Sequence, residues 1–230
     1  MRASRATLVL AVASWAAPCA LFAALPACGG GAPVAHAPAP SSSGPKPWGG
    51  FTDADFARYH SARVGVSFPL PDRAAWSVSD RDDLDGGWLV ARHGASSTTL
   101  RVRRWDAGLR VTRLDCEAHA REIGELARPA DVDKRFETLS DETVAQPRGW
   151  DARHWVATET TPDGRLVGHV YLFSARRRSC LIVHATTDAA SDLAYAELAD
   201  RLELLSSRVV GGILAEAEGS PLTLPPPRLP

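Results

Sequence analysis

The clearest fold signal in this 230-residue chain is the stretch HWVATETTPDGRLVGHVYLF at residues 154–173. Its two halves, residues 154–160 and 165–173, are rich in β-branched and aromatic side chains, and the tetrapeptide TPDG between them is typical of a tight turn. The pattern predicts a β-hairpin. A further strand over residues 180–185 extends the hairpin into an antiparallel meander.

Four short strands are predicted ahead of the meander, because apolar and polar side chains alternate there at the period of a strand with one buried face. They cover residues 64–68, 76–78, 88–93 and 98–105. In the first of them Pro69 and Pro71 are expected to end the strand.

Two amphipathic helices complete the pattern. Residues 113–127 and 192–205 carry apolar side chains at the three- and four-residue spacing of one helix face. The order of strands, helix, strands, helix is not the strict alternation of a doubly wound sheet. We therefore expect an α+β fold, with a mostly antiparallel sheet of about six to seven strands and two main helices packed on it.

This order resembles the PsbP/Mog1-like fold, an α/β/α sandwich that also occurs in bacterial envelope lipoproteins. The resemblance covers roughly residues 59–210, and its residues are GVSFPLP at 65–71, a tryptophan strand, TLRV at 99–102, the meander and the helices. Proteins of this type are mostly noncatalytic binding or assembly proteins with unlike partners. The resemblance therefore implies a binding role and assigns no functional residue.

The first 27 residues have the pattern of an export signal, because Arg2 and Arg5 precede an uncharged apolar run over residues 7–27. The tetrapeptide LPAC at residues 25–28 resembles a bacterial lipobox, although Pro26 departs from the usual small residue. This resemblance implies cleavage before Cys28 and lipidation of Cys28 with acyl chains such as palmitate. An ordinary secreted protein with an incidental cysteine is the alternative.

The sequence thus predicts four parts. They are a lipoprotein signal peptide at residues 1–27, a lipid anchor and flexible linker at 28–50, a single α+β domain at 51–210, and a flexible proline-rich tail at 211–230. Because several acyl chains hold a protein at a membrane, the expected location is the bacterial cell envelope. Gly29 in place of Asp favours the outer membrane, facing the periplasm.

Composition narrows the partners and the chemistry. The 26 Lys and Arg residues against 27 Asp and Glu leave a net charge of -1, so no nucleic-acid partner is expected. Common hydrolase and nucleotide-site motifs are missing, so we predict neither a catalytic residue nor a cofactor. The favoured hypothesis is a noncatalytic protein that binds an envelope protein or polymer. The alternative is a small-ligand carrier or hydrolase with a pocket between the sheet and a helix.

Three groups of side chains could carry a site. Cys116 and Cys180 either form a disulfide, which an exported protein can keep, or remain buried thiols, and both readings stay open. The histidines on three successive predicted strands could converge on a metal ion, but surface or strand-end positions are the preferred account, and no metal is predicted. The acidic cluster is read as a solvated turn and not a calcium loop, since arginines stand at two of the ligand positions. The histidines are His154, His169 and His184, and the acidic residues are Asp80, Asp82, Asp83 and Asp85.

Overall fold

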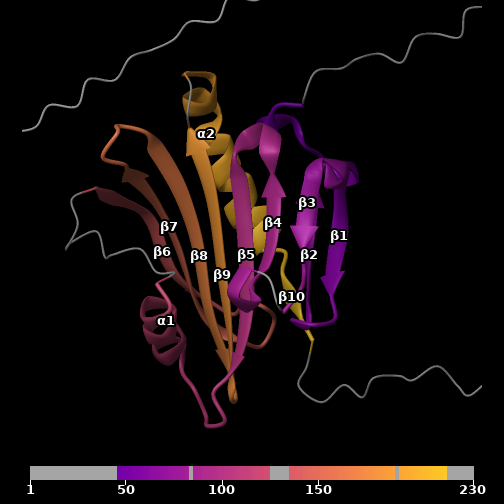
Figure 1. Cartoon of the computed structure of the whole chain (residues 1–230), viewed down its shortest axis with the longest axis vertical. Helices are drawn as coiled ribbons and strands as arrows, with labels where there is room; N and C mark the ends of the chain where they lie inside the picture. The colour runs from indigo at the N-terminus through magenta and orange to yellow at the C-terminus, as the bar shows by residue number, and fades with distance from the viewer. Residues whose placement is uncertain (1–45, 83–84, 125–134, 190–191, 217–230) are drawn as a thin grey trace, which may run out of the picture. The chain divides into compact units, whose positions relative to one another are not determined.

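The computed structural model describes residues 46–82, 85–124, 135–189 and 192–216 (Figure 1). The predicted signal peptide, Cys28, Asp83 and the tail beyond residue 216 lie outside these residues. Within them the chain forms ten strands and two α-helices. The strands make a seven-stranded sheet of order β3-β4-β5-β9-β8-β7-β6 and a three-stranded sheet of order β1-β2-β10.

All strand pairs are antiparallel. The small sheet consists of β1 (Phe56–Ser61), β2 (Val66–Pro71) and β10 (Leu214–Ala215). The large sheet consists of β3 (Trp76–Ser79), β4 (Leu89–His93), β5 (Thr98–Asp106), β6 (Phe136–Val144), β7 (Asp151–Thr160), β8 (Leu166–Arg176) and β9 (Ser179–Ala189). The helices are α1 (Arg113–Glu122) and α2 (Asp192–Leu204), and α2 continues as a π-helix over Leu205–Val210. Neither α-helix in the described residues is long and apolar enough to span a membrane.

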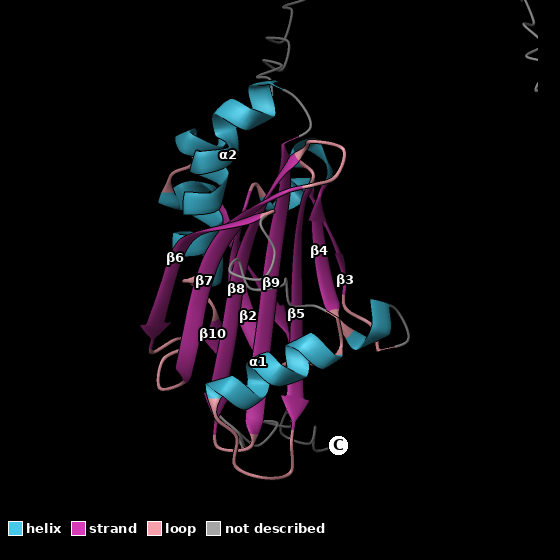
Figure 2. Cartoon of the chain, turned by 90° about the vertical axis from the view of Figure 1, so that its left-hand side faces the viewer, coloured by secondary structure: helices cyan, strands magenta, loops and turns pink. Residues whose placement is uncertain are grey.

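Helices cover both faces of the large sheet. Successive residues of a strand point to opposite faces, so Leu181 and Val183 of β9 join the core beneath α2, whereas Cys180 and Ile182 join the core beneath α1. Figure 2 shows α1 lying across the sheet. The small sheet adds β2 to the α2 side, where β2 contacts the π-helix. This arrangement confirms the predicted α+β fold class.

Three strands are absent from the prediction, namely β1, β6 and β10. Most side chains of β6 are exposed, so its sequence FETLSDETV lacks the alternation that marks a half-buried strand. Strand β2 ends at Pro71 as expected, but Pro69 does not end it and lies inside the strand. Strand β10 pairs only with Val66 and Ser67 of β2, so Pro69 and Pro71 have a ladder partner on the β1 side alone. A residue without a backbone N–H is tolerated at such an edge position.

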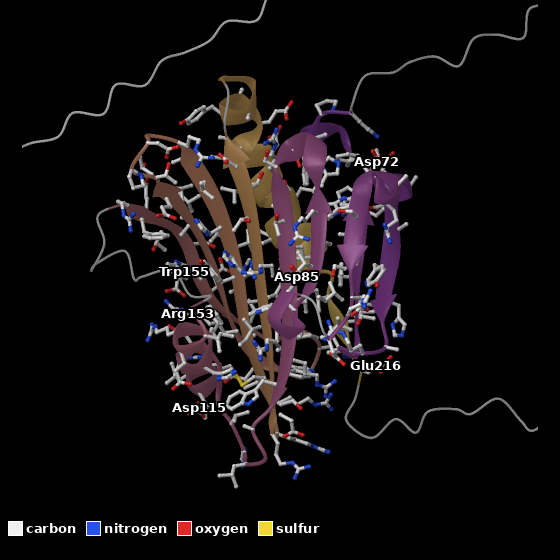
Figure 3. All side chains as sticks on the ribbon, viewed as in Figure 1. Asp72, Asp85, Asp115, Arg153, Trp155 and Glu216 are labelled. Atoms are coloured by element: carbon white, nitrogen blue, oxygen red, sulfur yellow. A yellow bond between two sulfur atoms is a disulfide. The ribbon has the colours of Figure 1, made fainter. Side chains whose placement is uncertain are left out.

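Helix α1 begins as predicted but ends earlier. The hydroxyl of Thr112 accepts a hydrogen bond from the Asp115 amide, and the Asp115 carboxylate accepts one from the Thr112 amide, which forms a capping box (Figure 3). The helix ends at Glu122, and Gly124 follows with a φ of 76°. That left-handed conformation favours glycine and terminates a helix. The expected end at residue 127 lies outside the described residues.

The packed region is longer than the expected domain of residues 51–210. Trp48, which the sequence assigns to the linker, is only 4% exposed, and Ile213 is also buried. Both residues belong to the core beneath α2. Short flanking segments therefore form part of the domain at both ends.

Candidate functional site

Two hollows flank the exposed ridge of α2, and Glu203 lines both of them. The first, which we call the N-terminal groove, has a volume of about 390 Å³ and is lined by Trp48, Gly49, Phe51, Phe56, Asp200, Glu203, Leu204, Ser207 and Arg208. The second, which we call the β6 pocket, has a volume of about 230 Å³ and is lined by Leu139, Ser140, Val156, Ala199, Leu202, Glu203 and Ser206.

The chain that enters the domain builds one wall of the N-terminal groove. Trp48 packs edge-on against His93 and Phe51, with ring centroids 5.6 and 6.0 Å apart. At Gly49 the backbone lies so close to α2 that a Cβ atom would be 2.6 Å from Oδ2 of Asp200. Only glycine leaves that carboxylate in place.

The cations near the groove have partners, whereas two carboxylates do not. Lys46 lies 2.5 Å from Asp55, and the Lys46 hydrogen bond is the main reason why the pKa of Asp55 is lowered to about 2. Arg208 is paired with Asp53. Among the described residues, neither Asp200 nor Glu203 belongs to an ion pair. The groove therefore offers unpaired negative charge.

Aromatic rings stand beside these charges. The Lys46 ammonium lies 5.6 Å from the centroid of the Phe51 ring, and the Arg208 guanidinium lies 5.4 Å from that of Phe56. Cations are attracted to the face of an aromatic ring by its quadrupole. Both rings at the groove thus already make contacts of the kind that a bound organic cation would make.

The β6 pocket differs in chemistry, because its lining is mostly apolar. Leu139 is 52% exposed and lies at a register shift of β6 between Thr138 and Ser140. Such a bulge interrupts the edge strand, and the exposed acidic residues Glu137 and Glu142 further discourage the addition of a partner strand. The pocket therefore suits an apolar side chain or a small apolar molecule more than an added strand.

Of the three histidines singled out in the sequence, the structure brings two together. His169 Nδ1 lies 3.1 Å from His184 Nε2, and Glu159 Oε2 lies 3.4 Å from His169 Nε2. Burial, together with the neighbouring His184, lowers the pKa of His169 to about 3. His154 instead lies on the opposite face, 3.3 Å from the Ser206 hydroxyl. The described residues contain no group of three side chains that could hold a metal ion.

A second buried cluster has no counterpart in the sequence analysis. His93 Nδ1 lies 2.7 Å from Ser96 Oγ, and that hydroxyl lies 2.7 Å from Oγ1 of Thr98. The carbonyl of Ser96 accepts a hydrogen bond from Arg201 of α2. All four side chains are buried, and burial lowers the pKa of His93. The cluster connects the β4–β5 turn to α2, and its serine and histidine lie outside both hollows.

The remaining candidates have clear structural roles. Each described acidic residue of the predicted turn is paired with an arginine: Asp80 and Asp82 pair with Arg63, and Asp85 pairs with Arg92. These described residues therefore form no cluster of free carboxylates. Cys116 and Cys180 form a disulfide that joins α1 to β9. Sequence reasoning missed the groove residues because Asp200 and Glu203 occupy ordinary exposed positions of a helix.

Comparison with known proteins gives structural likeness alone. No protein-family model matches the chain, and no curated protein matches it. It is similar to the cyanobacterial PsbP protein CyanoP from Synechocystis, with 13% identity, a TM-score of 0.43, and coverage of 73% of this chain and 96% of that one. It is also similar to LpqN of Mycobacterium tuberculosis, a protein involved in cell envelope biogenesis, with 12% identity, a TM-score of 0.39, and coverage of 70% and 91%. The assignment of the α+β fold class is based on the strand order and the two helices of this structure.

Proposed function

We propose that this chain is a lipid-anchored, noncatalytic protein of the bacterial cell envelope that binds a protein or envelope component through the surface around α2. The observation that carries the proposal is the docking of Trp48 and Gly49, at the end of the predicted linker, against the core and α2. In the sequence, the predicted linker that begins at Cys28 ends at these residues. The signal and lipobox of residues 1–28 favour a lipid-anchored envelope protein, and Gly29 in place of Asp favours the outer membrane, with the domain facing the periplasm.

The chemistry of the two hollows favours binding over catalysis. Their lining combines aromatic rings, apolar side chains and carboxylates, and includes no histidine, cysteine or lysine among the described residues. Acyl or phosphoryl transfer needs a nucleophile within reach of a base and of the substrate. The described residues hold two serine–histidine contacts near these hollows. His93 and Ser96 line neither hollow. Ser206 lines the β6 pocket, but its neighbour His154, 3.3 Å away, does not.

Replacement of the predicted lipidated cysteine tests the anchor. The full chain and its Cys28→Ala variant are expressed in a bacterium, membranes are separated from soluble fractions, and intact mass is measured. We expect the wild-type chain to sediment with membranes and to carry the added mass of acyl chains. We expect the Cys28→Ala variant to move to the soluble fraction. Cys19→Ala is the matched control. Equal membrane retention of the Cys28→Ala variant would refute the anchor.

A second candidate function follows from the β6 pocket, which lies between the large sheet and a helix. Its apolar lining of Leu139, Val156 and Leu202 fits a carrier of a small apolar ligand. A photo-crosslinker placed at the exposed Leu139 separates the two functions. Crosslinks to one defined envelope protein favour the first, whereas a small apolar compound extracted from the purified chain favours the second.

A further inference from the structure

We propose that the N-terminal groove binds the headgroup of a zwitterionic phospholipid with a primary ammonium group, namely phosphatidylethanolamine. The ammonium group would lie beside Asp200 and Glu203, and the phosphate beside Arg208. This inference rests on the proposed function, because membrane tethering brings such headgroups within reach. It adds a ligand class and a site to that function.

The acidic side of the groove matches an ammonium group. Asp200 and Glu203 have no ion-pair partner in the described chain, and the rings of Phe51 and Phe56 line the same groove. Carboxylates make charge-assisted hydrogen bonds to an ammonium group. The two rings already contact the Lys46 and Arg208 cations, so the carboxylates supply the attraction. Gly49 keeps this side open, since a Cβ atom there would collide with the Asp200 carboxylate.

The basic side of the groove matches a phosphate. The Arg208 side chain is 46% exposed, and its partner Asp53 is 88% exposed. An ion pair so open to water contributes little stability. A phosphate can therefore take the place of Asp53, because the guanidinium group binds phosphate oxygens in a bidentate manner.

A zwitterion accounts for the two charge signs within one groove. A phosphate-only headgroup would be repelled by Asp200 and Glu203, whereas a simple amine would leave Arg208 unused. The volume of about 390 Å³ lies within the range of small-molecule sites.

Seventeen residues separate Cys28 from Lys46, and this segment can span at most about 60 Å. An anchored domain can therefore bring the groove to the bilayer surface.

Vesicle flotation tests the proposal in the Cys28→Ala background of the full chain, which removes any acyl anchor. The probes are vesicles of phosphatidylcholine alone, of phosphatidylcholine with phosphatidylethanolamine, and of phosphatidylcholine with phosphatidylglycerol. We expect the chain to float with the phosphatidylethanolamine vesicles. The added pair Asp200→Asn and Glu203→Gln should lower the partition constant onto these vesicles about tenfold, which corresponds to about 1.4 kcal/mol.

The matched control is the pair Glu137→Gln and Glu142→Gln on β6, which removes two exposed carboxylates outside the groove and should leave flotation unchanged. Gly49→Ala should weaken flotation by displacing the Asp200 carboxylate. Circular dichroism melts check that each variant folds.

Two results would overturn the proposal. One is undiminished flotation of the Asp200→Asn, Glu203→Gln variant. The other is a preference for phosphatidylglycerol, or displacement from all vesicles by a lysine-rich peptide, which would mark an anionic surface effect or a protein partner. Because the assay needs no acylation, its failure is distinct from failure of the anchor, which the fractionation of Cys28→Ala tests.

Discussion

Trp48 packs edge-on against His93, with their ring centroids 5.6 Å apart and their ring planes at 86°. Trp48 comes from the end of the predicted linker, whereas His93 closes β4 in the large sheet. The contact makes the last residues of the predicted linker part of the hydrophobic core. The position at which the linker meets the domain is therefore fixed by packing.

Replacing Trp48 tests this packing. Because Trp48 is buried in the core beneath α2, we expect Trp48→Ala to lower the free energy of unfolding by about 3–5 kcal/mol. Urea denaturation of the purified chain measures the change. Leu109→Ala, at an exposed position, should change stability by less than about 0.5 kcal/mol. Wild-type stability of the Trp48 variant would contradict the predicted role.

Arg153 connects β7 to α1 and β6 through two carboxylates, and Figure 3 labels it on β7 beside Trp155. Its guanidinium nitrogens lie 2.8 Å from Oε1 of Glu117 and 2.7 Å from Oδ2 of Asp141. These contacts raise the pKa of Arg153, and the contact with Arg153 lowers the pKa of Asp141. The Glu117 side chain is only 6% exposed. Arg153→Met should therefore cost about 3 kcal/mol of unfolding free energy, because it leaves a buried carboxylate short of a partner.

The neighbouring Arg121 provides the comparison. It also contacts Glu117, at 2.6 Å, but its side chain is 51% exposed. Arg121→Met should cost less than about 1 kcal/mol in the same denaturation experiment. Equal losses for both variants would show that neither the lower exposure of Arg153 nor its second contact, with Asp141, sets the energy.

The His169 pair predicts a loss of stability in mild acid. His169 stays neutral in the folded chain down to a pKa of about 3, whereas in the unfolded chain it takes up a proton near pH 6.5. Unfolding therefore binds a proton below about pH 6.5, and stability falls as the pH falls from there toward 3. His169→Phe should flatten this slope between pH 7 and 5, as measured by denaturant midpoints. Leu109→Ala, at an exposed position with no titratable group, should leave the slope unchanged, and an unchanged slope in His169→Phe would refute the assignment.

The disulfide gives a redox-dependent stability. Cys116 and Cys180 are 64 residues apart in the chain, and closing a loop of that size stabilises a fold by roughly 4 kcal/mol in the chain-entropy model. We expect a strong reductant to lower the denaturation midpoint of the wild-type chain. The double variant Cys116→Ser, Cys180→Ser should be less stable and insensitive to reductant. A wild-type midpoint that ignores reductant would contradict this expectation.

The sequence predicts the elements that are extensively buried. The strands β7, β8 and β9 are rich in β-branched and aromatic side chains because many of their residues are packed, and the leucines of α2 recur at helical spacing because they face the core. In contrast, β6 exposes most of its side chains at the sheet edge, so no period marks it. The edge strand β6 therefore escapes prediction, whereas β3, at the opposite edge of the large sheet, is predicted because the buried Trp76 alternates with the exposed Ser77.

The candidate site is less predictable than the fold, because its residues meet only through tertiary packing. Trp48 stands among prolines and glycines, a composition typical of a linker, and Asp200 faces it from the other end of the chain. The histidines show a related limit. His154 pairs in register with Leu172, whereas His169 and Tyr171 share the opposite face of β8. A shift of one residue in register reverses a face, and sequence spacing alone does not fix register.

The small sheet has a mechanical consequence for a chain held by its N-terminus. A pull on the residues ahead of Lys46 would first extract Trp48 from between its aromatic neighbours. The load would then reach β1, whose strand partner in the described chain is β2 alone, and the ladder would open from Phe56 and Pro71 onward. The seven-stranded sheet shares no ladder with β1, so tension would unzip the rim of the domain and leave its centre folded.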